Sequence, residues 1–176
     1  VAMRQGDESL NQRLFATVEH SSDADIPLAD WQLRLVEQGV GVSTNERYVE
    51  YHVSAEEQRW AQTYLAALKA GGSRVVGLVV ETFHTAPHRD WPIAHFVALV
   101  KLLRDYDPAL RFVLFGAPLA ADKVDALRSV LGERLLSAAG ALTLRQSAAA
   151  MNELDLFIGL DTGPSHIIAA LGVPAV

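Results

Sequence analysis

Several components of common functional sites are absent from this sequence of 176 residues. It contains no cysteine, which excludes disulfide bonds and zinc sites with thiolate ligands. No apolar run reaches the roughly 20 residues that a membrane-spanning helix needs. The formal net charge of -6 argues against non-specific binding to nucleic acid, because such binding depends on a basic surface. A globular chain that does not bind nucleic acid is therefore expected.

Two common nucleotide-binding motifs are also absent. No G-x-G-x-x-G follows the apolar run Arg74–Glu81, and no G-x-x-x-x-G-K-[ST] occurs anywhere. Neither a dinucleotide site of the NAD type nor a P-loop is predicted. His84 and His88 have the spacing of a metal-binding pair, but their loop has no helical spacing to hold both on one ion. No metal ion and no cofactor are expected.

The most informative stretch is Asp155–Val176, with the sequence DLFIGLDTGPSHIIAALGVPAV. Leu156–Leu160 has the length and composition of a strand buried on both faces. Ser165–Leu171 is predicted to be a short apolar helix that ends at Gly172. Polar turn residues at 161–164 lie between them. Open α/β sheets bind ligands at such turns, and the N–H groups at the start of the following helix suit a phosphate.

The turn itself permits two interpretations. Gly163 is expected to let the backbone approach a ligand and to permit a positive φ angle. Pro164 fits the first turn of a helix, where its missing N–H costs nothing. The alternative is an ordinary turn between a strand and a helix, with Asp161 or Thr162 as the helix cap.

Apolar runs alternate with amphipathic stretches over the rest of the chain. The predicted strands are Arg74–Glu81, Phe112–Phe115, Leu135–Leu136 and Leu156–Leu160. The predicted helices are 28–38, 54–70, 92–106, 122–131, 143–152 and 165–171, and a short strand is predicted at 14–18. This alternation predicts an α/β fold, a Rossmann-like parallel sheet with helices on both faces.

The loops that follow the predicted strands are expected to converge on one crevice. Right-handed crossovers place all of them at one edge of the sheet, namely the loops 82–90, 116–118, 140–143 and 161–166. The crevice would hold Arg89, histidines 84, 88 and 166, and two helix N-termini, which together suit a diphosphate. Plainer alternatives are that Arg89 is a solvated arginine beside Asp90 and that the histidines are exposed loop residues.

Two motifs resemble a known family. The sequences DTGPSH at 161–166 and AALGVP at 169–174 resemble the D-T-G-x-x-H-x-x-A-A-L-G-x-P signature of glycosyltransferase family 9. Members of this family are ADP-heptose:lipopolysaccharide heptosyltransferases and their relatives. The sequence RDWP at 89–92 resembles their K-x-W-P motif. The resemblance covers roughly residues 25–176.

The resemblance implies a two-domain GT-B protein about twice as long as this chain. Residues 1–50 would then be the end of the N-terminal domain and the interdomain connection. Residues 51–176 would be the nucleotide-sugar-binding, Rossmann-like domain, incomplete at its C-terminus, since the chain ends where a further strand is expected to begin. The catalytic base of the family lies in the N-terminal domain, and no residue of this chain is assigned to it.

The resemblance also implies roles for individual residues. Arg89 replaces the lysine that contacts phosphate, a change that preserves the charge. The positions that match the family's substrate-binding residues are Thr85, Arg89, Asp161, Thr162, Gly163 and His166. Two departures leave the nucleotide open: Glu81–His84 lacks the family's glycine turn, and no acidic residue follows Gly116-Ala117 before Asp122.

The implied activity is inverting, metal-independent transfer of a heptose or related sugar. The donor would be a nucleoside-diphosphate sugar, ADP-heptose in the family, and the acceptor a lipopolysaccharide or similar glycan. The protein would be cytoplasmic, and peripheral contact with the inner membrane would involve parts outside this chain. Alternatives are a nucleotide-sugar epimerase of GT-B fold and a non-catalytic nucleotide-binding α/β module. This chain by itself is expected to bind nucleotide without transferring sugar.

Overall fold

The structure, a computed structural model, divides into two units, Val1–Tyr48 and Val49–Val176. It describes residues 2–3, 8–12, 17–18, 28–44, 49–82, 87–118 and 121–176. The first unit pairs two short parallel strands and contains two helices: β1 (Ala2–Met3), β2 (Thr17–Val18), α1 (Glu8–Asn11) and α2 (Leu28–Val40). The helix predicted at 28–38 is thus confirmed. Only the last two residues of the strand predicted at 14–18 are described, and both are in β2.

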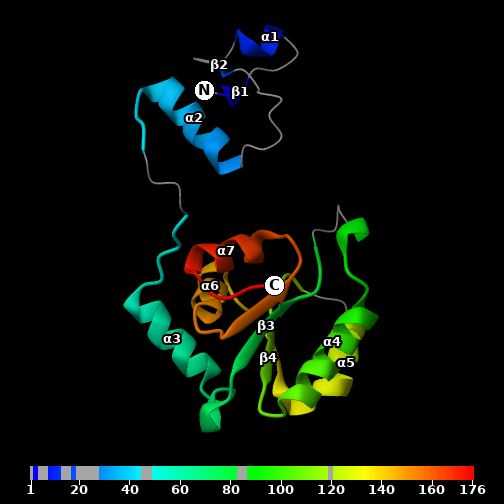
Figure 1. Ribbon diagram of the computed structural model, residues 1–176. Coiled ribbons are helices and arrows are strands. Elements are labelled where there is room, and N and C mark those ends of the chain that lie inside the picture. Colours follow the sequence, from blue (N-terminus) through cyan, green and yellow to red (C-terminus); the bar gives the residue numbers. More distant parts are fainter. Residues whose placement is uncertain are drawn as a thin grey trace. The chain divides into compact units, whose positions relative to one another are not determined.

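The second unit is a four-stranded parallel sheet with helices on both faces (Figure 1). Its strands are β3 (Val75–Val79), β4 (Arg111–Leu114), β5 (Leu135–Ser137) and β6 (Leu156–Gly159). Its helices are α3 (Ala55–Leu65), α4 (Ile93–Tyr106), α5 (Ala121–Leu131), α6 (Leu144–Met151) and α7 (Gly163–Leu171). Three short 3-10 helices connect them: η1 (Ala70–Gly72), η2 (Pro87–Arg89) and η3 (Gly132–Arg134). The predicted Rossmann-like α/β fold is confirmed.

Burial on both faces explains the apolar composition of the central strand. All five residues of β3 are buried, and successive side chains enter different cores. Val75 and Val79 pack with residues of α3, α6 and α7, whereas Val76 and Leu78 pack with residues of α4 and α5. Figure 1 shows these two groups of helices on opposite sides of the sheet.

Gly77 is required in the middle of β3 by close packing. A Cβ atom at this position would lie 2.4 Å from Cδ1 of the buried Leu154 and 3.3 Å from Cδ2 of Phe157. The side chains of Leu154 and Phe157 can pack directly against the backbone of β3 because Gly77 has no side chain.

Two of the predicted helix starts are confirmed in atomic detail. Ser54 and Glu57 form a reciprocal capping box at the start of α3, and Thr143 and Gln146 form another at the start of α6. α3 is shorter than predicted, because the helical hydrogen bonding ends at Leu65 and a turn leads into η1. None of the helices in the described part of the chain is long and apolar enough to span a membrane.

The strand order places a ligand site at one defined point. The order is β5-β4-β3-β6, so the chain adds β4 and β5 on one side of β3 and then crosses to the other side for β6. A parallel bridge between Phe157 and Ala175 extends the pairing beyond β6. Crevices outside the carboxyl ends of strands at such a reversal are the usual ligand sites of open α/β sheets.

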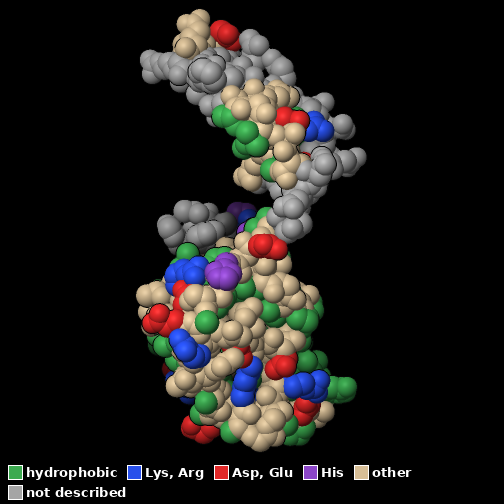
Figure 2. Space-filling view, turned by 90° about the vertical axis from the view of Figure 1, so that its left-hand side faces the viewer, with side chains coloured by type: hydrophobic (Ala, Val, Ile, Leu, Met, Phe, Trp, Pro, Cys, Tyr) green, Lys and Arg blue, Asp and Glu red, His purple; other side chains and the backbone are tan. Residues whose placement is uncertain are grey.

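Surface charges of the second unit are mixed in sign. On the face that Figure 2 shows, which includes α3, acidic and basic side chains are interspersed, and the basic ones do not form an extended patch. This face offers no concentrated positive field of the kind that attracts a polyanion.

Candidate functional site

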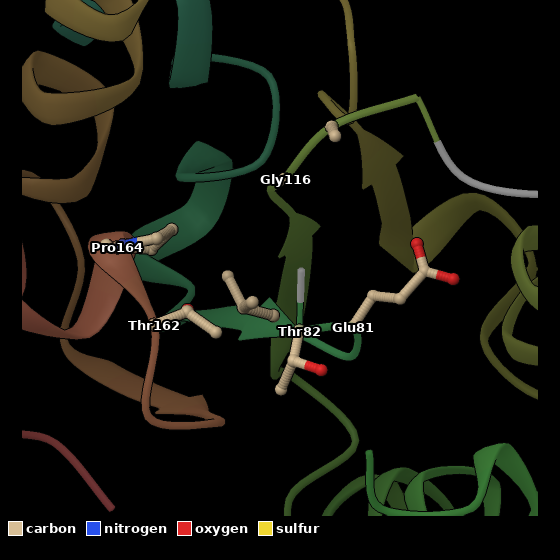
Figure 3. A pocket seen from close by; sticks show the side chains of 8 residues that line it. Glu81, Thr82, Gly116, Thr162 and Pro164 are labelled. Carbon is tan, nitrogen blue, oxygen red and sulfur yellow. The ribbon is translucent and has the colours of Figure 1, made fainter. Parts of the chain in front are cut away.

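A pocket of about 110 Å³ lies at the reversal of strand order. It is lined by the end of β3, the turn after β4 and the start of α7 (Figure 3), namely by Val79, Glu81, Thr82, Gly116, Ala117, Thr162, Gly163 and Pro164. Pockets that enclose a drug-sized ligand measure roughly 300–1,000 Å³. This pocket is therefore too small to enclose a whole ligand of that size and could hold only part of one.

The predicted convergence of loops is confirmed for three of the four. Residues from the loops 82–90, 116–118 and 161–166 line the pocket together. The fourth loop, 140–143, lies behind the second: the Gly140 N–H donates to the Gly116 carbonyl at 2.9 Å. A Cβ at Gly140 would lie 2.7 Å from Cγ of Pro118, so the two loops are in direct contact.

The helix that follows β6 begins without a side-chain cap. Thr162 occupies the N-cap position with 7% of its surface exposed, but its side chain makes no capping hydrogen bond. Its hydroxyl donates instead to the carbonyl of Leu160 at 3.3 Å, and the Ser165 hydroxyl donates to the same carbonyl at 2.5 Å. The interpretation of Thr162 as an ordinary capping side chain is therefore wrong. The start of α7 keeps its partial positive charge on the pocket side.

Gly163 does not use the positive φ that glycine permits, and the position expected of Pro164, in the first turn of a helix, is confirmed. Gly163 is the first residue of α7 and is not among the glycines of positive φ, and Pro164 follows within the first turn. A helical conformation before proline is disfavoured for residues with a Cβ, because that atom meets the proline ring. Glycine avoids this contact, so the helix begins one residue before the proline.

Three predicted side chains are brought together beside this turn. The Arg89 guanidinium donates from Nη2 to Oδ2 of Asp161 at 2.5 Å, and Nε2 of His166 lies 3.7 Å from Oδ1 of the same carboxylate. Arg89 and Asp161 are 50% and 69% exposed in their side chains, and His166 is 79% exposed. The cluster thus lies in solvent and can change partners at little cost.

The carboxylate of Asp90, the chain neighbour of Arg89, has a different partner from Arg89. Its Oδ1 accepts hydrogen bonds from the backbone N–H of Thr82 at 2.8 Å and from the Thr82 hydroxyl at 2.5 Å. The hydroxyl bond is the main cause that lowers the pKa of Asp90. Pro92 occupies the N-cap position of α4, and that end of the helix has no side-chain cap.

Comparison with known families identifies the chain. The family profile described as glycosyltransferase family 9 (heptosyltransferase) matches residues 3–176. The chain belongs to glycosyltransferase family 9. Among curated proteins, the comparison finds no match.

Solved structures of related proteins share the fold of this family 9 chain. A glycosyltransferase of family 9 from Veillonella parvula is 22% identical, with a TM-score of 0.73 over 90% of this chain and 45% of its own. The E. coli heptosyltransferase WaaC, solved with ADP, is 19% identical, with a TM-score of 0.60 over 89% of this chain and 46% of its own. The E. coli ADP-heptose heptosyltransferase II is 23% identical, with a TM-score of 0.56 over 72% of this chain and 38% of its own. The chain spans less than half the length of each.

The remaining predicted residues of this family 9 chain are placed differently. Thr85 and His84 lie outside the described residues, and His88 is exposed. No cluster of three or more metal-ligating side chains occurs among the described residues. Asp105 and Asp107 form a D-x-D sequence at the end of α4, but these carboxylates pair with Arg104 and Arg74.

One polar network was not anticipated from the sequence. Lys123, in the first turn of α5, forms an ion pair with Glu81, and its Nζ lies 3.8 Å from Oδ2 of Asp90. The signal that could have revealed Lys123 is topological, because Lys123 follows β4 at the same edge of the sheet where Glu81 follows β3. A lysine at that distance from the strand carries no motif of its own.

Proposed function

We propose that this chain is the nucleotide-binding part of a glycosyltransferase that uses a nucleoside-diphosphate sugar. The observation that carries the proposal is the uncapped start of α7, with Arg89 and His166 beside it, at the reversal of strand order. Family membership supports the reaction class. A heptose, carried on ADP, is the donor sugar proposed from the related E. coli enzymes, whose structures are described with ADP and ADP-2-deoxy-2-fluoro heptose.

Arg89 is proposed to hold the diphosphate. A guanidinium can donate to two phosphate oxygens at once, and a diphosphate offers it more negative charge than the single carboxylate of Asp161. Hydrogen bonds to charged groups contribute about 1.5–3 kcal/mol each, and a helix N-terminus contributes about 0.3–1 kcal/mol. Micromolar affinity needs about 8 kcal/mol, so contacts to the base and ribose are expected to supply the rest.

The start of α7 is proposed to complete the phosphate site. Thr162 and Gly163 line the pocket, and Asp161 and His166 flank it, so the four positions act as one turn around the ligand. Thr85 is proposed as a further substrate-binding residue on the strength of the family motif.

The chemistry proposed for the whole enzyme is an inverting displacement. The oxygen of an acceptor hydroxyl forms a bond to the anomeric carbon while the bond from that carbon to the diphosphate oxygen breaks. The diphosphate leaves with the electron pair, and the acceptor proton goes to a base outside this chain. Arg89 and α7 stabilise the charge that develops on the leaving group, which is electrostatic preorganisation. No metal ion is assigned a role in this step.

Titration of the whole chain with nucleotides tests the proposal. ADP, UDP and GDP are titrated calorimetrically into the folded protein, with adenosine as the control that lacks phosphate. We expect binding of at least one diphosphate and no transfer of sugar from ADP-heptose by this chain alone. A folded sample that gives no heat and no competition with any of the three would refute the nucleotide site.

The acceptor and the location belong to the same proposal. A lipopolysaccharide or similar glycan acceptor is proposed from the related E. coli ADP-heptose lps heptosyltransferase II, and contact with the membrane would involve parts outside this chain. An epimerase of related fold is the alternative enzyme. Product analysis of the full-length enzyme with ADP-heptose separates the two, because an epimerase changes the free nucleotide sugar whereas a transferase needs the acceptor.

A further inference from the structure

Three charged side chains form a half-buried network next to the proposed phosphate site. Lys123 pairs with Glu81, and its Nζ is 3.8 Å from Asp90. The side chains of Lys123 and Asp90 are each 23% exposed, which is less than half the exposure of Arg89. The network connects the end of β3, the segment before α4 and the first turn of α5.

Each acidic member of this network lies where it could compete for Arg89. Asp90 follows Arg89 directly in the chain, and Glu81 lines the pocket together with Thr162, whose chain neighbour Asp161 pairs with Arg89. Figure 3 shows the carboxylate of Glu81 pointing away from Thr162 and Pro164, that is, away from the α7 side of the pocket. Lys123 holds it there, because the ion pair fixes Glu81 on the α5 side.

Asp90 in turn forms hydrogen bonds to Thr82, on the other side of Arg89 in the sequence. Its carboxylate accepts two hydrogen bonds from Thr82, so residues 82 and 90 are joined across the segment between them. A partly desolvated carboxylate needs compensating charge, and Lys123 supplies it at the outer limit of ion-pair distance. Lys123 therefore acts mainly on Glu81 and secondarily on Asp90.

We infer that Lys123 is a positioning residue of the phosphate site: it holds the carboxylates of Glu81 and Asp90 away from Arg89. Among the described residues, Arg89 then pairs with the exposed carboxylate of Asp161, which a phosphate can displace. This inference rests on the proposed function for the identity of the ligand, but the geometry it describes exists without ligand. Loss of Lys123 would leave two carboxylates and no compensating cation next to the anion site, which disfavours a second anion.

The test uses the whole chain and two readouts, ADP affinity and hydrogen exchange of the Thr82 amide. In Lys123→Met, we expect ADP to bind about tenfold more weakly, with adenosine affinity changed less than about twofold. Thr82 amide exchange should be at least about fivefold faster, because its acceptor Asp90 is less firmly held. Lys123→Arg should restore both, and Lys123→Met with Glu81→Gln should recover most of the ADP affinity.

Each outcome decides one part of the inference. Unchanged exchange of the Thr82 amide in folded Lys123→Met overturns the positioning role. Faster exchange with unchanged ADP affinity overturns its effect on the phosphate site. If the wild-type chain binds no nucleotide, the proposed function fails, and the exchange measurement alone decides the role of Lys123. If Lys123→Met does not fold, Lys123→Gln removes the same charge with a polar side chain and must show the same two changes.

Discussion

Arg89 and Asp161 lie 72 residues apart in the sequence and form an ion pair of 2.5 Å between the two family 9 motifs. Both side chains are largely exposed, and exposed pairs of this kind contribute about 0–1 kcal/mol to stability. The pair therefore contributes little to the stability of the fold. It holds the guanidinium beside the start of α7, where the proposed phosphate would replace the carboxylate.

Replacement of Arg89 by alanine should separate phosphate binding from nucleoside binding. We expect Arg89→Ala to weaken ADP binding at least about tenfold, in line with the loss of a charge-assisted hydrogen bond. Adenosine affinity should stay nearly unchanged. The free energy of unfolding should change by less than about 1 kcal/mol. Arg89→Lys should be milder, because it keeps the charge and loses the second donor. Equal losses for ADP and adenosine would mean that Arg89 acts through the fold.

His166 should make a smaller contribution than Arg89. Its side chain is 79% exposed and touches the cluster only through Asp161 at 3.7 Å. We expect His166→Ala to weaken ADP binding about twofold to fivefold. His166→Gln keeps a hydrogen-bond donor and should weaken ADP binding less. Parallel titrations with ADP and adenosine check this. A loss as large as that of Arg89→Ala would contradict the ranking of the two residues.

The sequence predicted those features of the fold that depend on local pattern. Apolar runs gave the four strands, and both capping boxes were visible as Ser or Thr followed three residues later by Glu or Gln. Strand and helix ends were less accurate. Val80 is buried like the strand before it, yet it lies outside β3, because hydrogen bonding and not burial defines the end of a strand.

The sequence could not predict which side chains of the site pair with one another. Topology placed Arg89, Asp90 and Asp161 at one edge of the sheet, but which carboxylate the guanidinium contacts depends on the path of the chain. Asp90 accepts hydrogen bonds from Thr82, which lies eight residues earlier, and no local sequence pattern reveals that contact. The sequence also left the backbone of Gly163 open, since glycine permits both a positive φ and the helical start that it adopts here.

The ion pair between Glu57 and Arg145 should make stability depend on pH in the acidic range. Arg145 donates from Nε and Nη2 to the two oxygens of Glu57 at 2.6 and 2.5 Å, and so joins α6 to α3. This hydrogen bonding, chiefly from Arg145, lowers the pKa of Glu57 from 4.5 to about 2. A lowered carboxyl pKa stabilises the folded state above the unfolded value of 4.5, and the effect is lost as the pH falls toward about 2.

Unfolding of matched variants measures this dependence. Arg145→Met and Glu57→Gln should both be less stable than the wild type near neutral pH, and the difference should shrink as the pH falls through the range from 4.5 to about 2. Part of the cost of Arg145→Met is independent of pH, because Arg145 also donates to the His52 carbonyl and lies over the ring of Tyr51. A difference that stays constant over the whole range would contradict the assignment.

Substitution of Gly163 should reduce binding without unfolding the protein. A Cβ at this position meets no atom within 4 Å beyond its chain neighbours, and φ is not positive, so only the proline that follows opposes a side chain. We expect the free energy of unfolding of Gly163→Ala to change by less than about 1 kcal/mol. Gly163 lines the pocket, so Gly163→Val should narrow the pocket and weaken ADP binding by more than about tenfold.

Gly77 provides the matched control for this glycine. A Cβ there would lie 2.4 Å from Leu154, so Gly77→Ala should cost about 1–3 kcal/mol of stability by overpacking the core. Gly77 lies within β3 and does not line the pocket, so nucleotide affinity of the folded fraction should stay near the wild-type value. Thermal unfolding and ADP titration of both variants give the comparison. If Gly163→Val binds ADP as the wild type does, the turn after β6 does not approach the ligand, and the phosphate site must lie elsewhere along the sheet edge.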